Sequence, residues 1–585
     1  MFERNAKLIN KKFYQYLIPS IITIFALQFS SLLDGIIVGN MIGVEALTAS
    51  GLVLPIIYFI QTPGVALGVG GSIVVGNLLG KRDLKTANKA FSACLIYNFI
   101  VSLIFALLGP ILALPLAKMF SSDPNLIELG RQYLLMYFVT DPIITFTLMI
   151  ASFMAIDNNP RLSAILYIVS NVVKVGSMFL FINVFGWGLY GAALSTGFGC
   201  LISCVCLIFY AKSNKRLLKP TLKLKKSFVD FKDSVKASSA TALSMILLAI
   251  QMSIVNVFLG QLVTDSNDLL IYGLLANMVF IFDLFAGGVQ GVIPTICTIL
   301  YGEKDYYSLK SVVKKIYLIN LGFTILITAL IMIAPNVYAT VYNYQETDPA
   351  LVERAYYIIR IYLLSFIPYE LNKFSTNYYP SIEKNMPSYV TVILREAVVV
   401  LPLTIVLLHT NGLFGYALAQ VINEAAVVFI TYIFTIIYGK KRHKGYGIFL
   451  FEKEKFASYD VSFDNNIDNA AIISEELTDF ALKNKASNRN AQIIGLASEE
   501  IVSNIIYYGY KNKKQNFIDV NLKISEGKMI LRIRDDGLPF DPSKYGFDED
   551  DNYSTNGIKM IEKLTDKMTY MRVLNMNNTT FEMKL

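Results

Sequence analysis

The chain has 585 residues, of which 54% are hydrophobic and 16% are charged, and its mean hydropathy is +0.50. This apolar excess is larger than the surface of an ordinary soluble protein tolerates, so composition excludes a wholly soluble protein. The net charge is +8, but lysines and arginines gather in a few connections, which indicates membrane topology rather than nucleic-acid binding.

From Phe13 to Tyr438 the apolar residues come in long runs, each near the ~20 residues that a helix needs to cross a bilayer. These runs predict a polytopic α-helical membrane protein. The expected spans lie near 13–36, 50–78, 91–114, 129–155, 164–184, 190–211, 237–260, 269–300, 313–337, 353–380, 388–409 and 413–438. Lysines and arginines fall on alternate connections and at both ends of this region, so we expect both termini to face the cytoplasm.

The first half of the membrane region resembles the second half at an offset of about 222 residues. Gly80 matches Gly302 and Asp83 matches Asp305, so GKRD in one half corresponds to GEKD in the other. Six spans per repeat is an even number, so the two lobes have the same orientation, with substrate and ion sites expected near the midplane. The predicted domains are an N-lobe at 1–222, a C-lobe at 223–444 and a cytoplasmic domain at 445–585.

Five motifs occur in order along this region: Leu32–Gly39 (LLDGIIVG), Gly43–Leu47 (GVEAL), Asn158–Arg161 (NNPR), Ser170-Asn171 and Trp187–Ala193 (WGLYGAA). In this order they resemble the multidrug and toxic compound extrusion (MATE) family over about residues 10–440. The resemblance implies a bacterial inner-membrane exporter of drugs, organic cations or metabolites. It also implies a proton or sodium gradient as the driving force and two lobes that rock to alternate access.

Ionisable residues inside the spans are costly, which makes them candidates for function. They are Asp34, Asp141, Lys174, Asp283, Glu370, Lys373, Arg395, Glu396 and Glu424. Asp34 matches the first-helix acid of the family and is expected to couple ion movement to transport. A structural hydrogen bond near the helix end, where Gly35 and Gly39 follow, is the alternative. Asp141 precedes a proline, so it is a coupling residue or a partner for backbone groups that the proline frees.

Lys174 departs from the family pattern, because many prokaryotic relatives have an acid shortly after the Asn at the position of Asn171. Two arrangements remain open for Lys174. Its ammonium pairs with Asp34 in place of a coupling cation, or it pairs elsewhere in the bundle. In the C-lobe, Glu370 and Glu396 belong to a mixed charged set, which forms structural pairs or lines a cavity for a polar substrate.

The last part of the chain has no long apolar run and predicts a soluble α/β sandwich domain. A helical pattern over 488–510 places Glu500 and Asn504 four positions apart on one face. Strand-like runs at 517–524 and 528–533 lead to Asp535-Asp536-Gly537. An acidic stretch to Tyr553, a helix that begins near Gly557, and Thr579 close to the end complete the pattern.

This pattern resembles the ATP-binding domain of histidine kinases and anti-sigma-factor serine kinases over about residues 455–585. The likeness implies that Asn504 binds Mg²⁺ and that Glu500 is the general base. It also implies that Asp535 and Gly537 hold adenine, that Gly557 contacts phosphate and that Thr579 supports the base site. ATP and Mg²⁺ are therefore the expected cofactors. The family's Gly-x-Gly turn reads Thr555-Asn556-Gly557 here, a departure from the family pattern at the phosphate turn that bears on catalytic turnover more than on binding.

Two functions of different classes remain open. The first is a secondary exporter, a cation- or proton-coupled antiporter in the lipid bilayer, that moves a small organic substrate and is regulated by ATP. The second is a membrane receptor that controls a protein-serine kinase acting on a regulatory protein of the anti-sigma-factor-antagonist type. A lipid-precursor flippase is a third possibility. The five cysteines all lie in apolar spans and the two histidines lie far apart, so no metal cluster is expected beyond Mg²⁺ bound with ATP.

Overall fold

The structure is a computed structural model, and it describes residues 2–121, 123–221, 227–262, 266–341, 348–442, 445–452, 456–510, 515–525, 527–542 and 554–585. Two compact units make up the chain: one is Met1–Gln15, Glu303–Val312 and Phe451–Leu585, and the other is Tyr16–Gly302 and Val313–Leu450. The predicted lobe boundary at 222/223, residue 444 at the end of the predicted C-lobe, and the predicted acidic stretch at 543–553 lie outside the described residues.

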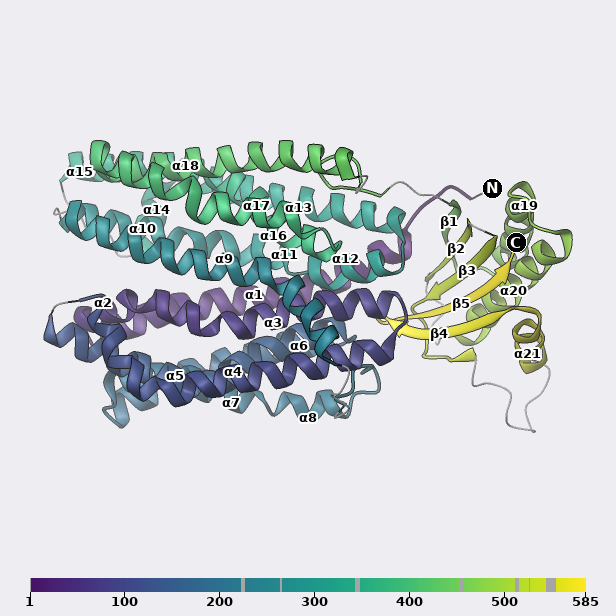
Figure 1. The fold of residues 1–585 in the computed structure, drawn as a ribbon, viewed down its shortest axis with the longest axis horizontal. Helices are drawn as coiled ribbons and strands as arrows, with labels where there is room; N and C mark the ends of the chain where they lie inside the picture. Colours follow the sequence, from purple (N-terminus) through teal and green to yellow (C-terminus); the bar gives the residue numbers. More distant parts are fainter. Residues whose placement is uncertain are drawn as a thin grey trace. The chain divides into compact units, whose positions relative to one another are not determined.

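The second unit is a bundle of long helices that run side by side (Figure 1). The described elements of its first half are α1 (Lys7–Met41), α2 (Val44–Leu52), α3 (Leu54–Gly80), α4 (Leu84–Lys118), α5 (Pro124–Ile156), α6 (Pro160–Phe179), the π-helical turn η1 (Leu180–Val184), α7 (Gly188–Ser203) and α8 (Cys206–Ala211). Outward side chains are apolar, as at Leu107 and Ile111, which are 68% and 70% exposed. Backbone groups that satisfy one another within a helix and an apolar surface are what a lipid environment requires.

The described elements of the second half are α9 (Ser227–Leu262), α10 (Ser266–Phe282), η3 (Asp283–Gly287), α11 (Gly288–Gln290), α12 (Ile293–Gly302), α13 (Tyr306–Ile333), α14 (Pro335–Val341), α15 (Pro349–Leu363), α16 (Phe366–Ser381), α17 (Asn385–Ile393), η4 (Leu394–Val398) and α18 (Val400–Arg442). Helix starts in the two halves share their caps. Asp83 and Asp305 each accept from a backbone N–H three residues later, at the starts of α4 and α13. Asp123 and Asp348 cap α5 and α15 by accepting from a backbone N–H two residues later, and each is followed by proline.

Ten helical stretches of the described residues are long and apolar enough to cross a membrane, judged by length and composition. One of them, Asn385–Lys441, contains a kink at Gly412, whose φ of 60° is not helical. The shorter helices α15 and α16 meet at a break around Leu364 and fall below the length of a single span. The predicted number of about twelve spans is reached when the kinked stretch counts as two and the broken pair as one.

The first unit contains a five-stranded antiparallel sheet in the order β1-β2-β3-β5-β4. Its strands are β1 (Ala457–Asp464), β2 (Phe517–Ser525), β3 (Lys528–Asp535), β4 (Lys567–Val573) and β5 (Met576–Lys584). The two predicted strands correspond to β2 and β3, which pair with Ile518 opposite Asp535 and Ser525 opposite Lys528. The predicted α/β sandwich is confirmed.

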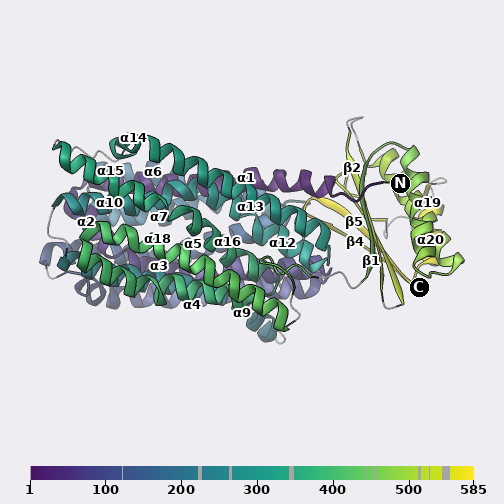
Figure 2. The same ribbon diagram turned by 90° about the horizontal axis from the view of Figure 1, so that it is seen from above.

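Helices α19 (Asp468–Lys483) and α20 (Asn488–Tyr508) cover one face of this sheet, as Figure 2 shows with the sheet nearly edge-on. Helix α21 (Ser554–Leu564) packs beside α20. Alternate strand residues point toward these helices and form the core, among them Val520, Leu531 and Phe581, all fully buried. The hydrophobic alternation of the strands therefore fixes which residues, including Asp535, face the helical layer.

Candidate functional sites

The first candidate site lies where β3 ends. The Asp535 side chain is buried, and its Oδ1 accepts from the backbone N–H of Gly537 at 2.8 Å and from the amide of Asn577 at 2.9 Å. Thr579 lies two residues after Asn577 on β5, so both share the face that bears Asp535. The structure thus brings together the predicted adenine residues Asp535, Gly537 and Thr579. Burial raises the pKa of Asp535 to about 6, against the N–H and amide bonds, which lower it.

Gly537 is held directly against the end of α20. A Cβ at Gly537 would lie 2.4 Å from the carbonyl oxygen of Gly509, and the same oxygen accepts from the N–H of Leu538 at 2.7 Å. A side chain at Gly537 would therefore push the strand end away from α20. The glycine fixes the distance between Asp535 and the helix that bears the remaining predicted nucleotide residues.

Helix α20 carries Glu500 and Asn504. The side-chain amide of Asn504 donates to Oε1 of Glu500 at 3.0 Å, which leaves the Asn504 oxygen as a possible Mg²⁺ ligand. Gly557, in the first turns of α21, packs on the same carboxylate, and a Cβ there would lie 2.3 Å from Glu500 Oε1. The structure therefore brings Glu500, Asn504 and Gly557 together. The side chains of Thr555 and Asn556 lie outside the described part of the chain.

These residues fit Mg²⁺–ATP by their chemistry. An amide oxygen for the metal lies next to a carboxylate, and a helix begins beside them, where backbone N–H groups favour phosphate. A buried carboxylate on β3 would accept from the adenine amino group of a bound nucleotide.

The second candidate site lies in the helical bundle. Asp34 on α1 and Lys174 on α6 form an ion pair, and their side chains are 21% and 10% exposed. Among the described residues, Oδ1 of Asp34 has no hydrogen-bond partner. Of the two arrangements left open for Lys174, the structure has the one with Asp34.

In the described chain, the hydrogen bonds of Asn171 and Asp141 do not involve Asp34 or Lys174. The amide of Asn171 donates to the carbonyl of Tyr167 on its own helix at 2.9 Å. Asp141 on α5 is buried, and its Oδ2 has no partner within the described chain. The backbone carbonyl of Asp141 accepts from the hydroxyl of Thr145 at 2.8 Å. Asp141 is therefore a buried acid without an ion-pair partner among the described residues.

Glu370 on α16 is the centre of a polar cluster in the second half. Its Oε2 accepts from the amides of Gln290 at 2.5 Å and Asn320 at 3.4 Å. One turn along α16, Lys373 forms an ion pair with Asp283. Structural pairing is one of the two expectations for this charged set, and among the described residues Lys373 pairs with Asp283 rather than with Glu370.

Arg395 forms a second cluster with acids from η4 and α18. Its guanidinium bonds Glu424 at 2.8 Å and Glu396 at 3.1 Å, and it lies 4.4 Å from the centre of the Tyr369 ring. The ring of Tyr369 also lies 5.7 Å from the ammonium of Lys373. Tyr369 thus lies between the two clusters, which places Glu370 and Glu396 in one polar region of the second half.

Reasoning from charge alone missed the amides in these clusters. The amides of Gln290 and Asn320 donate to Glu370, and the amide of Asn372 donates to Glu424. Gln28 of α1 donates to Asp283 at 3.1 Å. An amide inside an apolar span was the available signal, since such a group needs a partner in a membrane. Asn577 was missed in the ATP-binding domain, because an asparagine in a strand carries no comparable signal.

Comparison with known families supports both parts of this architecture. The family described as MatE matches residues 19–180 and 240–406, more than half of the chain, and the family described as histidine kinase-like ATPase domain matches residues 463–584. Multidrug export protein MepA of Staphylococcus aureus (strain MRSA252) is 22% identical over 434 residues, which are 72% of this chain and 93% of that protein. Probable multidrug resistance protein YoeA of Bacillus subtilis (strain 168) is 21% identical over 208 residues, which cover 35% of this chain and 45% of that protein.

Solved structures agree on the fold. A MOP superfamily transporter from Pyrococcus furiosus, described with a binding pocket of reverse polarity, is similar with a TM-score of 0.67 at 18% identity. A multidrug resistance MATE family transporter in an outward-facing conformation has the same TM-score and identity. Each comparison covers 75% of this chain and 98% of the other. The chain therefore belongs to the MatE family of multi-span membrane proteins, and it carries a histidine kinase-like ATPase domain at residues 463–584.

Proposed function

We propose that this protein is a secondary active exporter of drugs or metabolites, driven by a proton or cation gradient, and that ATP binding to its histidine kinase-like domain regulates transport. The observation that carries the exporter part is the Asp34–Lys174 ion pair inside the helical bundle. Relatives named for multidrug export and the MatE fold support the substrate class. We place the protein in the bacterial inner membrane with both termini in the cytoplasm, where ATP is available.

The ion pair offers a physical means of coupling. Two charges inside apolar helices stabilise each other only while both are ionised, and a proton on Asp34 or a competing cation would leave Lys174 without its partner. The ammonium of Lys174 would then be stabilised by pairing with another acceptor, and this change favours a different packing of α1 against α6. Asp141, Glu370 and Glu396 are the other acids proposed to sense ions or substrate, and Asn171 lies one turn before Lys174 on α6.

Flux in proteoliposomes tests this function. Purified protein is reconstituted into vesicles, and a proton or sodium gradient is imposed across their membrane. Transport of a fluorescent organic cation is then followed with ATP inside the vesicles and without ATP. Gradient-driven flux is expected in wild type and is expected to fall at least about tenfold in Asp34→Asn. The matched control is Asp83→Asn, because the hydrogen bond of this acid in the described part of the chain is the cap of α4, and asparagine caps equally well.

The ATP response is tested in the same vesicles with Asn504→Ala. This variant is expected to keep gradient-driven flux and to lose the effect of ATP, since the proposed Mg²⁺ ligand is gone. Absence of flux in wild type under every gradient would contradict the exporter, and an ATP effect that survives in Asn504→Ala would contradict the proposed nucleotide site.

A second function is favoured by one observation, the position of Glu500 beside Gly557 and Asn504. A carboxylate next to the proposed phosphate turn is what a protein-serine kinase needs, and its substrate would be a regulatory protein of the anti-sigma-factor-antagonist type. Incubation with labelled ATP and candidate substrates tests it. Glu500→Gln is expected to keep ATP binding and lose phosphate transfer, whereas Asn504→Ala is expected to lose both.

A further inference from the structure

The face of the sheet that points away from α19 and α20 is polar and yet buried. It carries Asp519, Asn521 and Lys523 on β2, Arg532 and Arg534 on β3, and Asn578 on β5, and none of these residues is more than 7% exposed. We call these six residues the polar face. Charged residues are almost never fully buried unless they have partners. This face therefore requires a covering segment with complementary charge.

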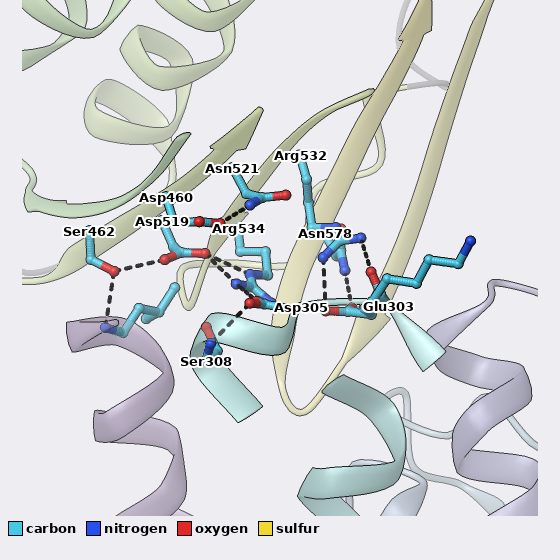
Figure 3. A network of polar contacts seen from close by, with 12 residues as sticks. Glu303, Asp305, Ser308, Asp460, Ser462, Asp519, Asn521, Arg532, Arg534 and Asn578 are labelled. Carbon is cyan, nitrogen blue, oxygen red and sulfur yellow. Dashed lines mark hydrogen bonds and ion pairs between the residues drawn. The ribbon is translucent and has the colours of Figure 1, made fainter. Parts of the chain in front are cut away.

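The connection between α12 and α13 supplies that charge (Figure 3). Glu303 Oε2 accepts from Arg534 at 2.9 Å and from Arg532 at 3.3 Å, and its Oε1 accepts from the amide of Asn578 at 2.6 Å. Asp305 Oδ2 accepts from the other guanidinium nitrogen of Arg534 at 2.6 Å. Two acids from one short connection thus fill a site that two arginines and an amide form on the sheet.

Backbone oxygens of the same connection complete the contact. The carbonyl of Glu303 accepts from Arg532 at 2.8 Å and from Lys523 at 3.2 Å, and the carbonyl of Lys304 accepts from Lys523 at 2.9 Å. Lys304 has a φ of 54°, a backbone conformation that few non-glycine residues adopt. The turn therefore directs two successive carbonyl oxygens at one lysine.

The charges balance only when this connection is present. On the sheet, Arg534 has one acid of its own, Asp519, at 2.5 Å. Burial opposes ionisation of Asp305, but Arg534, with Lys523 and Arg532, holds the pKa of Asp305 below its usual range. Burial and the nearby Arg532 lower the pKa of Lys523 to about 7. Without Glu303 and Asp305, the guanidinium groups would be buried with too few acids.

The internal repeat shows that these contacts are particular to the second half. Asp305 has a counterpart in Asp83, and both cap a helix. The position of Glu303 is occupied in the first half by Lys81, which pairs with Glu383 instead. The first-half connection has the wrong charge for Arg532 and Arg534. Of the two matching positions, only Glu303, which lies against the polar face, carries a negative charge.

The N-terminal segment makes a second contact with the same domain. Arg4 forms an ion pair with Asp460 at 2.5 Å, and the ring of Phe2 stacks on Phe463. Lys11 and Lys12, at the start of α1, both pair with Asp536, at 2.9 and 3.3 Å. The ammonium of Lys12 also lies 3.4 Å from the carbonyl of Asn575, in the β4–β5 turn.

Asp536 follows Asp535, the proposed acceptor for adenine, and Asn575 precedes Asn577, which bonds Asp535. Lys12 therefore bridges the two strand ends that form the proposed adenine site. Helix α1 runs from these lysines past Pro19 to Asp34, the acid paired with Lys174. On its way, α1 bonds the second half, where the hydroxyl of Ser20 donates to the carbonyl of Gly288 at 2.7 Å.

We propose that the polar face is a docking surface for Glu303–Val312 of this same chain, that the N-terminal segment docks beside it at Asp460 and Asp536, and that nucleotide bound at Asp535 acts on α1 through Asp536, Lys11 and Lys12. This inference names the regulatory route and rests on the proposed function above. Any movement of the two strand ends around adenine changes the position of Asp536 and Asn575. The two lysines transfer that change to the helix that carries Asp34.

Thiol accessibility tests the docking surface independently of transport. Asn578→Cys is made in the full-length protein in lipid nanodiscs, with the five native cysteines labelled in wild type as the background. The thiol at position 578 is expected to resist maleimide–polyethylene glycol. Adding Glu303→Lys, which installs the first-half residue, is expected to raise its labelling rate at least about tenfold, whereas adding Lys81→Ala leaves it unchanged.

Equal labelling in all three backgrounds would overturn the docking surface. Binding of a fluorescent ATP analogue to each variant shows that the ATPase domain is folded. If Glu303→Lys does not fold, Glu303→Gln replaces it, since glutamine keeps the shape and removes the charge, and an increase of about threefold in labelling is expected.

The route through the lysines is tested with Lys11→Gln/Lys12→Gln in proteoliposomes. ATP is expected to bind with an affinity within about threefold of wild type, and gradient-driven flux is expected to persist, while the ATP effect on flux disappears. Lys7→Gln is the matched control, because Lys7 begins α1 and does not contact Asp536 in the described chain, and it is expected to keep the ATP effect. An ATP effect that persists in the double variant overturns the route, whereas absence of wild-type flux overturns the exporter and leaves the labelling result standing.

Discussion

The carboxylate of Asp305 joins the ATPase domain to the start of a membrane helix, because its Oδ2 accepts from Arg534 at 2.6 Å while its Oδ1 caps α13. One side chain therefore closes a helix end and neutralises a buried guanidinium. Asp83, its counterpart in the first half, caps α4 and contacts no arginine of the ATPase domain within the described chain.

Comparing Asp83 with Asp305 separates the energy of the buried Asp305–Arg534 ion pair from the energy of the helix cap. Asp83→Ala and Asp305→Ala each lose a cap worth about 1 kcal/mol. Only Asp305→Ala removes a partner of buried Arg534, so we expect it to lower the free energy of unfolding of the ATPase domain by a further ~3–5 kcal/mol. Pulse proteolysis of the full-length protein across a urea series measures this. Equal effects of the two variants would show that Asp305 acts only as a cap.

The buried carboxyl of Asp535 makes nucleotide binding sensitive to pH. Burial raises the pKa of Asp535 to about 6, so the group becomes protonated as pH falls through 6. The carboxylate is the better acceptor for the adenine amino group, and ATP affinity is therefore expected to decrease below about pH 6. Titration with a fluorescent ATP analogue from pH 5 to 8 measures the change. Asp535→Asn is expected to bind at least about tenfold more weakly at pH 7, and to lack this part of the pH dependence.

The same pKa predicts an effect of opposite sign on stability. The folded pKa lies above the unfolded value of 3.8, so the stability associated with the protonated form is present below pH 4 and lost as pH rises through 6. At pH 7 the buried charge costs at most about 3 kcal/mol, because each pKa unit corresponds to about 1.4 kcal/mol. Asp535→Asn is therefore expected to raise the melting temperature at pH 7 and to change it less at pH 5.

Two glycines of the nucleotide site have different neighbours, which predicts different results for alanine. At Gly537 the obstacle is the backbone carbonyl of Gly509, and at Gly557 it is the flexible end of Glu500. Gly537→Ala is expected to cost about 1–3 kcal/mol of stability and to weaken ATP binding. Gly557→Ala is expected to change stability by less than ~1 kcal/mol, since the carboxylate can rotate away, and to lower phosphate transfer if Glu500 is the base. Equal losses of stability would contradict this reading of the packing.

The Asp34–Lys174 pair is open to a double-mutant cycle. Lys174→Gln leaves the half-buried Asp34 without its cation, and the loss of stability is expected to be smaller than the ~3–5 kcal/mol of a fully buried pair. Adding Asp34→Asn removes the stranded charge and is expected to recover most of that loss, while gradient-driven flux stays absent. Thermal unfolding in detergent and flux in vesicles give the two readouts. Additive losses in the double variant would show that the two groups do not interact.

Sequence by itself determined the membrane region, the internal repeat and the ATP-binding domain, because each has a local signature. Apolar runs set the spans, Asp83 and Asp305 mark matching helix starts, and the four-residue spacing of Glu500 and Asn504 places them together on one helix. Even the partner of Lys174 was among the arrangements that sequence left open.

Tertiary structure alone decided what covers the polar face of the sheet. Arg532 and Arg534 alternate with apolar residues along β3, a pattern that ordinarily predicts a solvated face. Their partners Glu303 and Asp305 lie 229 positions away from Arg532 and Arg534, respectively. A periodic pattern states which side chains share a face, but electrostatic pairing between distant segments depends on where the fold brings them, and no spacing in the sequence records that.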